Sequence, residues 1–264
     1  MNLSEICKGI EAIARETGNF IMSETEGFDI GSAERKGFND YVTHVDRGAE
    51  KMLVEKLGKL IPEAGFLVEE NTSSKKGVKY TWVVDPLDGT TNFIHGIHPY
   101  AISIGLMEHA EIIAGVVHEA AGAETFTAWK EGGAWLNGKK IVVSGADKAS
   151  LSLIATGFPY KDFTRLDRYL KCLGWLLNNT HGVRRMGAAS VDLAYVACGR
   201  YEVFFEYGLN PWDVAAGIIL IREAGGIVSD YSGKQDNLTG LEILASNRAV
   251  YPEILEIIST FMVK

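Results

Sequence analysis

Cysteine is scarce in this sequence and forms no recognisable metal-binding or disulfide pattern. The chain has three cysteines, Cys7, Cys172 and Cys198, which are scattered and odd in number. Zinc knuckles and disulfide frameworks depend on closely patterned cysteines, so the sequence supports neither of them. We expect three buried free thiols in a reducing compartment.

Basic tracts and long apolar runs are also absent. The net charge is −8, so nucleic acids and anionic membranes are poor candidate partners. No apolar stretch approaches the length of a membrane span, and the first residues lack the basic and apolar segments of a signal peptide. We therefore expect a cytoplasmic protein with no integral membrane segment. An acidic protein that binds a phosphorylated substrate needs metal ions to offset its own negative charge.

The rest of the composition is that of an ordinary globular protein. Of the 264 residues, 47% are hydrophobic and 23% are charged. This length allows one large domain or two closely packed lobes. Up to about residue 145 the chain is predicted to be two helical segments followed by a sheet, and beyond it strands and helices alternate, which favours α/β layering.

Hydrophobic periodicity and turn residues predict the individual elements. Helices are predicted over residues 3–24, from Thr43 or Asp46 to about 60, and over 164–178, 190–199, 214–223 and 252–262. Strands are predicted over residues 66–71, 80–84, 100–107, 112–118, 124–129, 151–156, 182–186, 201–205, 227–229 and 241–245. The first helix could also be two helices broken at Gly18. Asn137-Gly138 is typical of a hairpin turn, and Lys36 falls in a polar loop.

The stretch after the strand at Tyr80–Val84 carries the clearest chemical signal. Pro86 is expected to end the strand, and Asp85 and Asp88 flank it. Gly89-Thr90-Thr91 then indicates a helix start, whose backbone N–H groups can receive an anion. Two close carboxylates repel each other unless a cation lies between them, and Mg²⁺ prefers such oxygen ligands. Taken alone, this pattern is more often an Asp-rich turn that caps a helix.

A third carboxylate belongs to the same region if two strands are neighbours. Glu69 and Glu70 end the predicted strand that begins at Phe66. If that strand lies beside Tyr80–Val84, Glu69 approaches Asp85 and Asp88, and such a cluster is unfavourable without cations. The sequence alone leaves this adjacency open. The isolated residues His95, His98 and His118 show no metal-binding spacing, and we interpret them as structural.

Four motifs, in order along nearly the whole chain, resemble those of the inositol monophosphatase family within the Mg²⁺-dependent, lithium-sensitive phosphatases. They are Asp40-Tyr-Val-Thr43-His-Val-Asp46, Val68-Glu69-Glu70, Asp85-Pro-Leu-Asp88-Gly-Thr90-Thr-Asn-Phe93, and Trp212-Asp213-Val-Ala-Ala-Gly217 followed by Glu223-Ala-Gly-Gly226. The stretches Thr156–Pro159 and Arg184–Ala197 look more like the bacterial branch. The resemblance implies a single domain, residues 1–264, with lobes of about 1–145 and 146–264. It also implies a layered αβαβα sandwich of the inositol monophosphatase and fructose-1,6-bisphosphatase type, and a homodimer.

The same resemblance implies two to three Mg²⁺ ions. Glu69, Asp85 and the Leu87 carbonyl would bind the first ion, and Asp85, Asp88 and Asp213 the second. A third, looser ion would involve Glu69.

The resemblance also implies catalytic and substrate-binding roles. Asp46 would polarise Thr90, which with Glu69 would orient the attacking water, while Lys36 would approach the metal-bound waters. The backbone amides of Gly89 and Thr90 would hold phosphate. The substrate would contact residues of the metal site and of the second half of the chain: Glu69, Leu87, Asp88, Gly89, Thr90, Gly187, Ala189, Glu206 and Asp213. Arg184 is equally consistent with substrate binding and with pairing to surface acids.

The predicted function is the Mg²⁺-dependent hydrolysis of inositol monophosphate, or a similar phosphorylated polyol, to the alcohol and phosphate. Alternatives on the same fold are fructose-1,6-bisphosphatase, a phosphatidylinositol phosphate phosphatase, histidinol phosphatase and 3′(2′),5′-bisphosphate nucleotidase. An alternative of another class is a non-catalytic regulator that binds the transcription machinery.

Overall fold

The computed structural model describes residues 1–264 apart from 38–39, 161, 236–241 and 264, and leaves out the side chains of Lys36 and Asp40. The helices are α1 (Leu3–Ser23), α2 (His44–Leu60), α3 (Thr90–Ile94), α4 (Leu166–Asn179), α5 (Ala189–Ala197), α6 (Pro211–Glu223) and α7 (Tyr251–Met262). A seven-stranded sheet, the first sheet, contains β3 (Gly65–Val68), β4 (Tyr80–Asp88), β5 (Ala101–Glu108), β6 (Glu111–Glu119), β7 (Glu124–Trp129), β8 (Gly133–Leu136) and β9 (Lys139–Ile141), in that order. A five-stranded sheet, the second sheet, has the order β11 (Gly182–Arg184), β10 (Leu153–Thr156), β12 (Val203–Tyr207), β14 (Glu242–Ser246) and β13 (Ile227–Ser229). The strands β1 (Glu34–Gly37) and β2 (Asp40–Val42) pair with each other.

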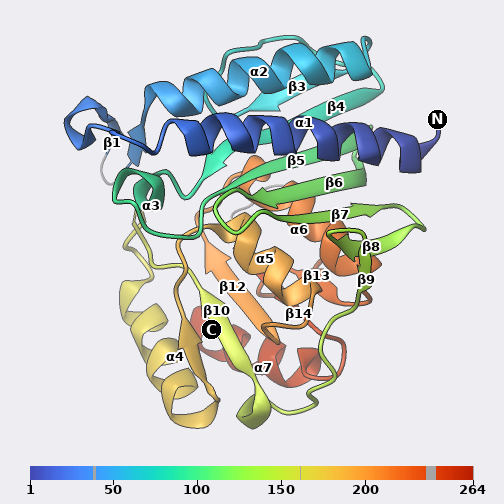
Figure 1. Cartoon of the computed structure of the whole chain (residues 1–264). Coiled ribbons are helices and arrows are strands. Elements are labelled where there is room, and N and C mark those ends of the chain that lie inside the picture. The colour runs from blue at the N-terminus through green and yellow to red at the C-terminus, as the bar shows by residue number, and fades with distance from the viewer. Residues whose placement is uncertain (38–39, 161, 236–241, 264) are drawn as a thin grey trace.

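These elements stack in five layers, as Figure 1 shows from top to bottom. Helices α1 and α2 pack on the outer face of the first sheet, and α5 and α6 lie between the two sheets. Helices α4 and α7 form the last layer, against the second sheet. The predicted αβαβα sandwich is therefore confirmed.

The middle layer packs very closely on the first sheet. A side chain at Gly105 of β5 would place its Cβ 2.9 Å from the Cβ of Ala215 in α6, and one at Gly115 of β6 would place it 2.6 Å from Ile219. Glycine therefore lets α6 approach the sheet at a distance that a larger residue would prevent. The apolar residues Val203, Phe204 and Phe205 of the predicted strand 201–205 lie in β12 and are fully buried.

Helix α1 runs without a break through Gly18, so it is one helix rather than two. A Cβ at Gly18 would lie 2.5 Å from the ring of His118 on β6, which explains the glycine by close packing. His118 itself is buried and its Nδ1 lies 2.9 Å from the Thr125 hydroxyl. Burial lowers the pKa of His118 to about 4, so it is a neutral structural histidine.

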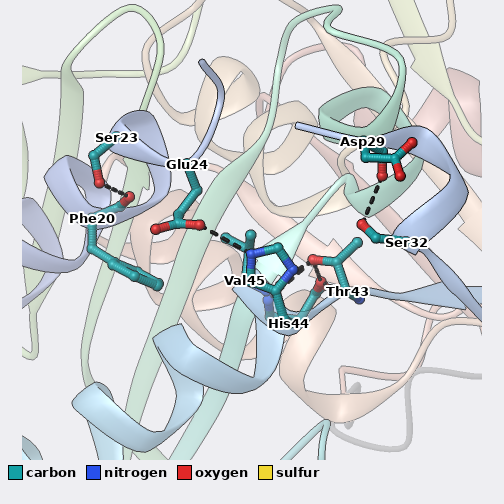
Figure 2. Close-up of polar contacts among 9 residues, drawn as sticks. Phe20, Ser23, Glu24, Asp29, Ser32, Thr43, His44 and Val45 are labelled. Atoms are coloured by element: carbon teal, nitrogen blue, oxygen red, sulfur yellow. Dashed lines mark hydrogen bonds and ion pairs between the residues drawn. The ribbon is translucent and has the colours of Figure 1, made fainter. Parts of the chain in front are cut away.

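The structure shows which of Thr43 and Asp46 caps the start of α2. Thr43 is the N-cap, and its hydroxyl accepts hydrogen bonds from the N–H groups of Val45 and Asp46. The Asp46 carboxylate in turn accepts from the Thr43 N–H at 2.8 Å, which completes a capping box. Figure 2 shows this turn beside the end of α1, where Glu24 Oε2 lies 3.0 Å from His44 Nε2.

Strand β4 differs from its prediction, because it continues through Pro86 to Asp88. The register between β4 and β5 shifts between Asp85 and Asp88, and this irregularity accommodates a residue that has no N–H to donate. The open question of adjacency is settled as well. Strands β3 and β4 are parallel neighbours with Val68 opposite Val84, so Glu69 and Asp85 follow at the same edge.

Smaller differences occur elsewhere. The segment before β10 forms a short 3₁₀ turn, Ala149–Leu151, so the strand starts at Leu153 instead of residue 151. The helical periodicity of residues 164–178 places Leu170 on the apolar face, but Leu170 in α4 is 52% exposed, whereas Cys172 is buried. Of the three free cysteines, Cys198 is only half-buried. The start of the predicted strand 241–245 lies outside the described residues. Within the described part of the chain, no helix is both long and apolar enough to span a membrane.

Candidate active site

A cavity of about 440 Å³ opens where the end of β4 meets the starts of α3, α5 and α6. Most of the predicted site residues line it: Glu69, Asp85, Leu87, Asp88, Gly89, Thr90, Gly187, Ala189, Glu206 and Asp213. Residues from positions 69 to 213 thus converge on one space. The structure brings together the carboxylates that the sequence shows only in separate motifs.

The end of β4 fixes the first carboxylate and the turn that follows it. Asp85 is buried, and its Oδ1 accepts a hydrogen bond of 2.9 Å from the Leu87 N–H. Gly89 has φ +88° and precedes α3, a backbone conformation that favours glycine. A Cβ there would also lie 3.0 Å from the Pro99 carbonyl oxygen. The predicted helix start at Thr90 is confirmed, although α3 is only five residues long.

Thr90 is hydrogen-bonded to Asp46, which lies outside the cavity. The Thr90 hydroxyl lies 2.9 Å from Asp46 Oδ1 and 3.0 Å from the Leu87 carbonyl oxygen. Asp46 is buried, and burial raises the pKa of its carboxyl above the ordinary value despite hydrogen bonds from Thr43 and Thr90. Asp46 does not line the cavity itself. Its contact with a cavity-lining residue is the hydrogen bond from Thr90.

The segment that carries Glu69 is tied to α2 by a residue that sequence reasoning missed. Glu50 is fully buried in α2, and its carboxylate accepts hydrogen bonds from the Glu70 N–H at 2.6 Å and the Thr72 N–H at 2.8 Å. These bonds fix the backbone directly after Glu69 and on both sides of Asn71. In the sequence, Glu50 looks like any helical glutamate, and no local signal distinguishes it.

The other two predicted metal ligands are fixed by local and long-range hydrogen bonds. Asp88 Oδ2 accepts from both the N–H and the hydroxyl of Ser190, at 2.7 Å and 2.5 Å. Asp213 is the third residue of α6, and its Oδ2 accepts from the Asn210 N–H at 2.7 Å as part of a capping box. Each carboxylate is therefore oriented by donors of the protein.

The raised pKa values of these acids show that their negative charges are unfavourable in the cavity. Desolvation, followed by repulsion from Glu69, Asp88 and Asp213, raises the pKa of Asp85 well above its ordinary value. Burial also raises the pKa of Asp88 to about 6, against the opposing hydrogen bonds from Ser190. Such a set of oxygen donors fits cations, which would relieve the repulsion.

The cavity offers carboxylate oxygens and open space, which suit Mg²⁺. Among the residues that the structure describes, no three His, Cys, Asp or Glu side chains already form a metal-binding cluster. Mg²⁺ usually keeps several waters and is held by one or two carboxylates together with substrate phosphate. The open space beside Asp85 and Asp88 leaves room for those ligands.

Comparison with known proteins agrees with this geometry. The sequence profile of the inositol monophosphatase family matches residues 2–262. The chain belongs to the inositol monophosphatase family.

Individual relatives carry two kinds of name. The chain is 44% identical over 252 residues to the Nus factor SuhB of Pseudomonas aeruginosa, covering 92% of this chain and 91% of that protein. It is 42% identical over 222 residues to the inositol-1-monophosphatase of Mesorhizobium japonicum, covering 84% of each. The crystal structure of the extragenic suppressor protein suhB from Bartonella henselae superposes with a TM-score of 0.90 at 36% identity, covering 95% of this chain and 97% of that one.

In this inositol monophosphatase family member, the far wall of the cavity contains a second acidic pair. Glu206 lies within β12 rather than after it, and it is buried. Burial, then repulsion from Asp213, raises the pKa of Glu206 to about 8. A Cβ at Gly157 would lie only 1.9 Å from the Glu206 carboxyl carbon, so the glutamate occupies the space that a larger residue would fill.

Asp192 is the other member of this pair, and sequence reasoning missed it. It lines the cavity from α5, is 1% exposed, and its Oδ1 has no hydrogen-bond partner in the described structure. Burial, then repulsion from Glu206 and Asp88, raises the pKa of Asp192 well above its ordinary value. An aspartate inside the apolar helix Ala189–Ala197 was a possible signal, because such an acid is rarely buried without a role.

The remaining predicted residues are placed differently. Arg184 is exposed, does not line the cavity, and donates to the Val183 carbonyl oxygen, whereas the adjacent Arg185 does line it. The Arg185 guanidinium lies 5.5 Å from the ring centre of Phe158. Lys36 lies within β1, and its side chain is outside the described part of the chain. His95 is exposed at the cavity, although we interpreted it as structural.

Proposed function

We propose that this protein is a Mg²⁺-dependent phosphomonoesterase that hydrolyses inositol monophosphate, or a closely similar polyol phosphate, to the alcohol and phosphate. One observation carries the proposal. Asp85 is buried near the end of β4, is repelled by Glu69, Asp88 and Asp213, and lies beside the start of α3. A protein keeps such mutually repelling acids together where they bind cations.

The residues of the cavity divide between two or three ions. Glu69, Asp85 and the Leu87 carbonyl would hold one Mg²⁺, and Asp85, Asp88 and Asp213 a second. A looser third ion would use Glu69. Bound Mg²⁺ supplies an activated water and charge neutralisation at the phosphate.

The protein's own groups would position the reactants. The Gly89 and Thr90 amides would bind the phosphate. Asp46 accepts from the Thr90 hydroxyl and so orients its oxygen toward the attacking water, together with Glu69. Asp213, at the first turn of α6, would act on the leaving alkoxide through the second Mg²⁺ that it helps to hold. Displacement in line with the leaving oxygen requires no covalent intermediate on the protein. Lys36 would approach the waters around the ions.

The substrate's polyol ring would lie against the second half of the chain. Glu206 would offer its carboxyl group to ring hydroxyls, and Gly187 and Ala189 leave space beside it. Arg185 extends this surface, and we place it ahead of Arg184 as the basic residue that meets the substrate. Fructose 1,6-bisphosphate, a phosphatidylinositol phosphate, histidinol phosphate and a 3′(2′),5′-bisphosphate nucleotide are the alternative substrates.

A substrate panel tests the proposal. Phosphate release is measured with and without Mg²⁺ on inositol 1-phosphate and the four alternatives. A Mg²⁺-dependent preference for inositol 1-phosphate supports the proposal, and a preference for another compound keeps the chemistry but replaces the substrate. No release from any of them in the presence of Mg²⁺ contradicts it. The molecular mass of the purified protein in solution tests whether it is the expected homodimer. Phosphate release in the presence of lithium tests whether lithium inhibits it.

A second candidate function is binding to the transcription machinery. The observation that favours it is the name of the Pseudomonas aeruginosa relative, a Nus factor, at 44% identity. Both functions would act in the cytoplasm. The Asp88→Asn variant separates them, because a purely regulatory protein would keep its binding to transcription complexes without this carboxylate, whereas hydrolysis would stop.

A further inference from the structure

The carboxylate of Asp88 is held by a residue 102 positions later in the chain. Ser190 is fully buried and is the second residue of α5. Its backbone N–H lies 2.7 Å from Asp88 Oδ2, and its hydroxyl lies 2.5 Å from the same oxygen. Ser190, which lies between the two sheets, therefore donates two hydrogen bonds to one oxygen of Asp88 at the end of β4.

Two donors on one oxygen restrict the carboxylate more than one donor does. A carboxylate is planar and rigid, so fixing Oδ2 from two directions also fixes the direction in which Oδ1 points. Hydrogen bonds to an ionised acceptor are shorter and roughly twice as strong as neutral ones. The 2.5 Å contact from the hydroxyl lies in the range for O–H donation to a charged oxygen.

Joining the first sheet to the middle layer does not explain this contact. Other hydrogen bonds also join these parts of the molecule: the Ser103 hydroxyl on β5 donates to the Trp212 carbonyl in α6, and the Asn92 side-chain amide in α3 donates to the Met186 carbonyl before α5. Those acceptors are neutral backbone carbonyls. Ser190 alone among these three directs its hydroxyl at an ionisable acid of the cavity.

We propose that Ser190 is a positioning residue that sets the Mg²⁺ affinity of the site to which Asp88 belongs. The inference rests on the proposed function, and it deepens it by assigning control of metal binding to α5. Groups that hydrogen-bond to metal-ligating carboxylates typically contribute tenfold to a hundredfold to metal affinity.

The test compares Ser190→Ala with a matched control, Ser152→Ala. Ser152 is equally buried, but its hydroxyl donates to the Lys148 carbonyl, and neither residue lines the cavity. Mg²⁺ binding to each protein is measured by isothermal titration calorimetry, and the Mg²⁺-dependent rise in Tm by calorimetry. Ser190→Ala is expected to raise the Mg²⁺ Kd by about tenfold or more, while Ser152→Ala keeps the wild-type Kd.

Kinetics and a second variant complete the test. In Ser190→Ala the Mg²⁺ concentration for half-maximal phosphate release should rise, and kcat at saturating Mg²⁺ should change less. Ser190→Cys keeps the approximate size of the side chain and a weak donor, so its Mg²⁺ Kd should lie between those of wild type and Ser190→Ala. If Ser190→Ala does not fold, the Kd of Ser190→Cys alone tests the inference. A wild-type Mg²⁺ Kd in both Ser190 variants overturns the inference and leaves the proposed function intact. Wild-type protein that binds no Mg²⁺ overturns both.

Discussion

Replacing Asp88 with asparagine is expected to abolish phosphate release and, without Mg²⁺, to stabilise the protein. The two effects have one cause. Asp88 contributes a negative charge that a cation would use, and in the metal-free protein the same charge is partly desolvated beside other acids. A structural role alone would instead predict that the variant is less stable under every condition.

The magnitude follows from the pKa. Burial raises the pKa of Asp88 from 3.8 to about 6, against hydrogen bonds from Ser190. At about 1.36 kcal/mol per pKa unit, ionisation lowers the free energy of unfolding by about 3 kcal/mol. Because the folded pKa is the higher one, this penalty is absent below pH 3.8, grows up to about pH 6, and is complete above it. The asparagine amide is a weaker acceptor for the two Ser190 donors, so the net gain should be about 1–3 kcal/mol.

The assay is urea unfolding in EDTA, followed by tryptophan fluorescence, at about pH 4.5 and about pH 8. Exposed Asp147 provides the control Asp147→Asn. Asp88→Asn should unfold at higher urea than wild type at the higher pH, and the difference should shrink at the lower pH. Added Mg²⁺ should stabilise wild type and have less effect on the variant. An Asp88→Asn protein that is less stable than wild type in EDTA at about pH 8 would refute the reasoning.

Three further predictions concern the cavity and its supports. Glu206→Gln should stabilise the metal-free protein, most strongly above pH 8 because burial raises the pKa of Glu206 to about 8, as urea unfolding across pH would show; no gain would contradict the assigned burial cost. Glu50→Gln should lower the free energy of unfolding by about 1–3 kcal/mol, because the amide oxygen can accept from only one of the Glu70 and Thr72 N–H groups and the other loses its acceptor; equal stability by the same assay would argue against this anchoring. Gly157→Ala should raise the KM for the preferred substrate, because its Cβ would lie 1.9 Å from the Glu206 carboxyl carbon and displace that side chain; an unchanged KM would remove Glu206 from the substrate surface.

Much of the fold could be predicted because its signals are local. Apolar periodicity located the helices and the meander of β5–β7, and the Asn137-Gly138 turn lies between β8 and β9 as expected. Pro86 misled because a register shift between strands, which the sequence does not reveal, lets β4 continue past it. The assignment of one domain with two lobes stays a prediction.

The site residues that could be predicted lie in local motifs, and those that could not be predicted depend on long-range contacts. Asp85, Asp88, Thr90 and Asp213 lie in compact motifs, and all of them line the cavity. Glu50, Ser190 and Asp192 matter through partners that are distant in sequence, and a single sequence gives no information about such pairs. In the adjacent residues Arg184 and Arg185, only the path of the backbone after β11 decides which one reaches the cavity.

The place of α6 in the middle layer has a consequence for the synthesis of the chain. A ribosome releases all seven strands of the first sheet before it has made α6 (Pro211–Glu223), the helix that packs across β4–β8. Until then, the later part of the chain does not cover the inner face of that sheet. It also does not yet surround the carboxylates of Glu69, Asp85 and Asp88. A chain that ends near residue 145 therefore exposes apolar surface, and we expect chaperones to bind such a nascent chain until α6 has been made.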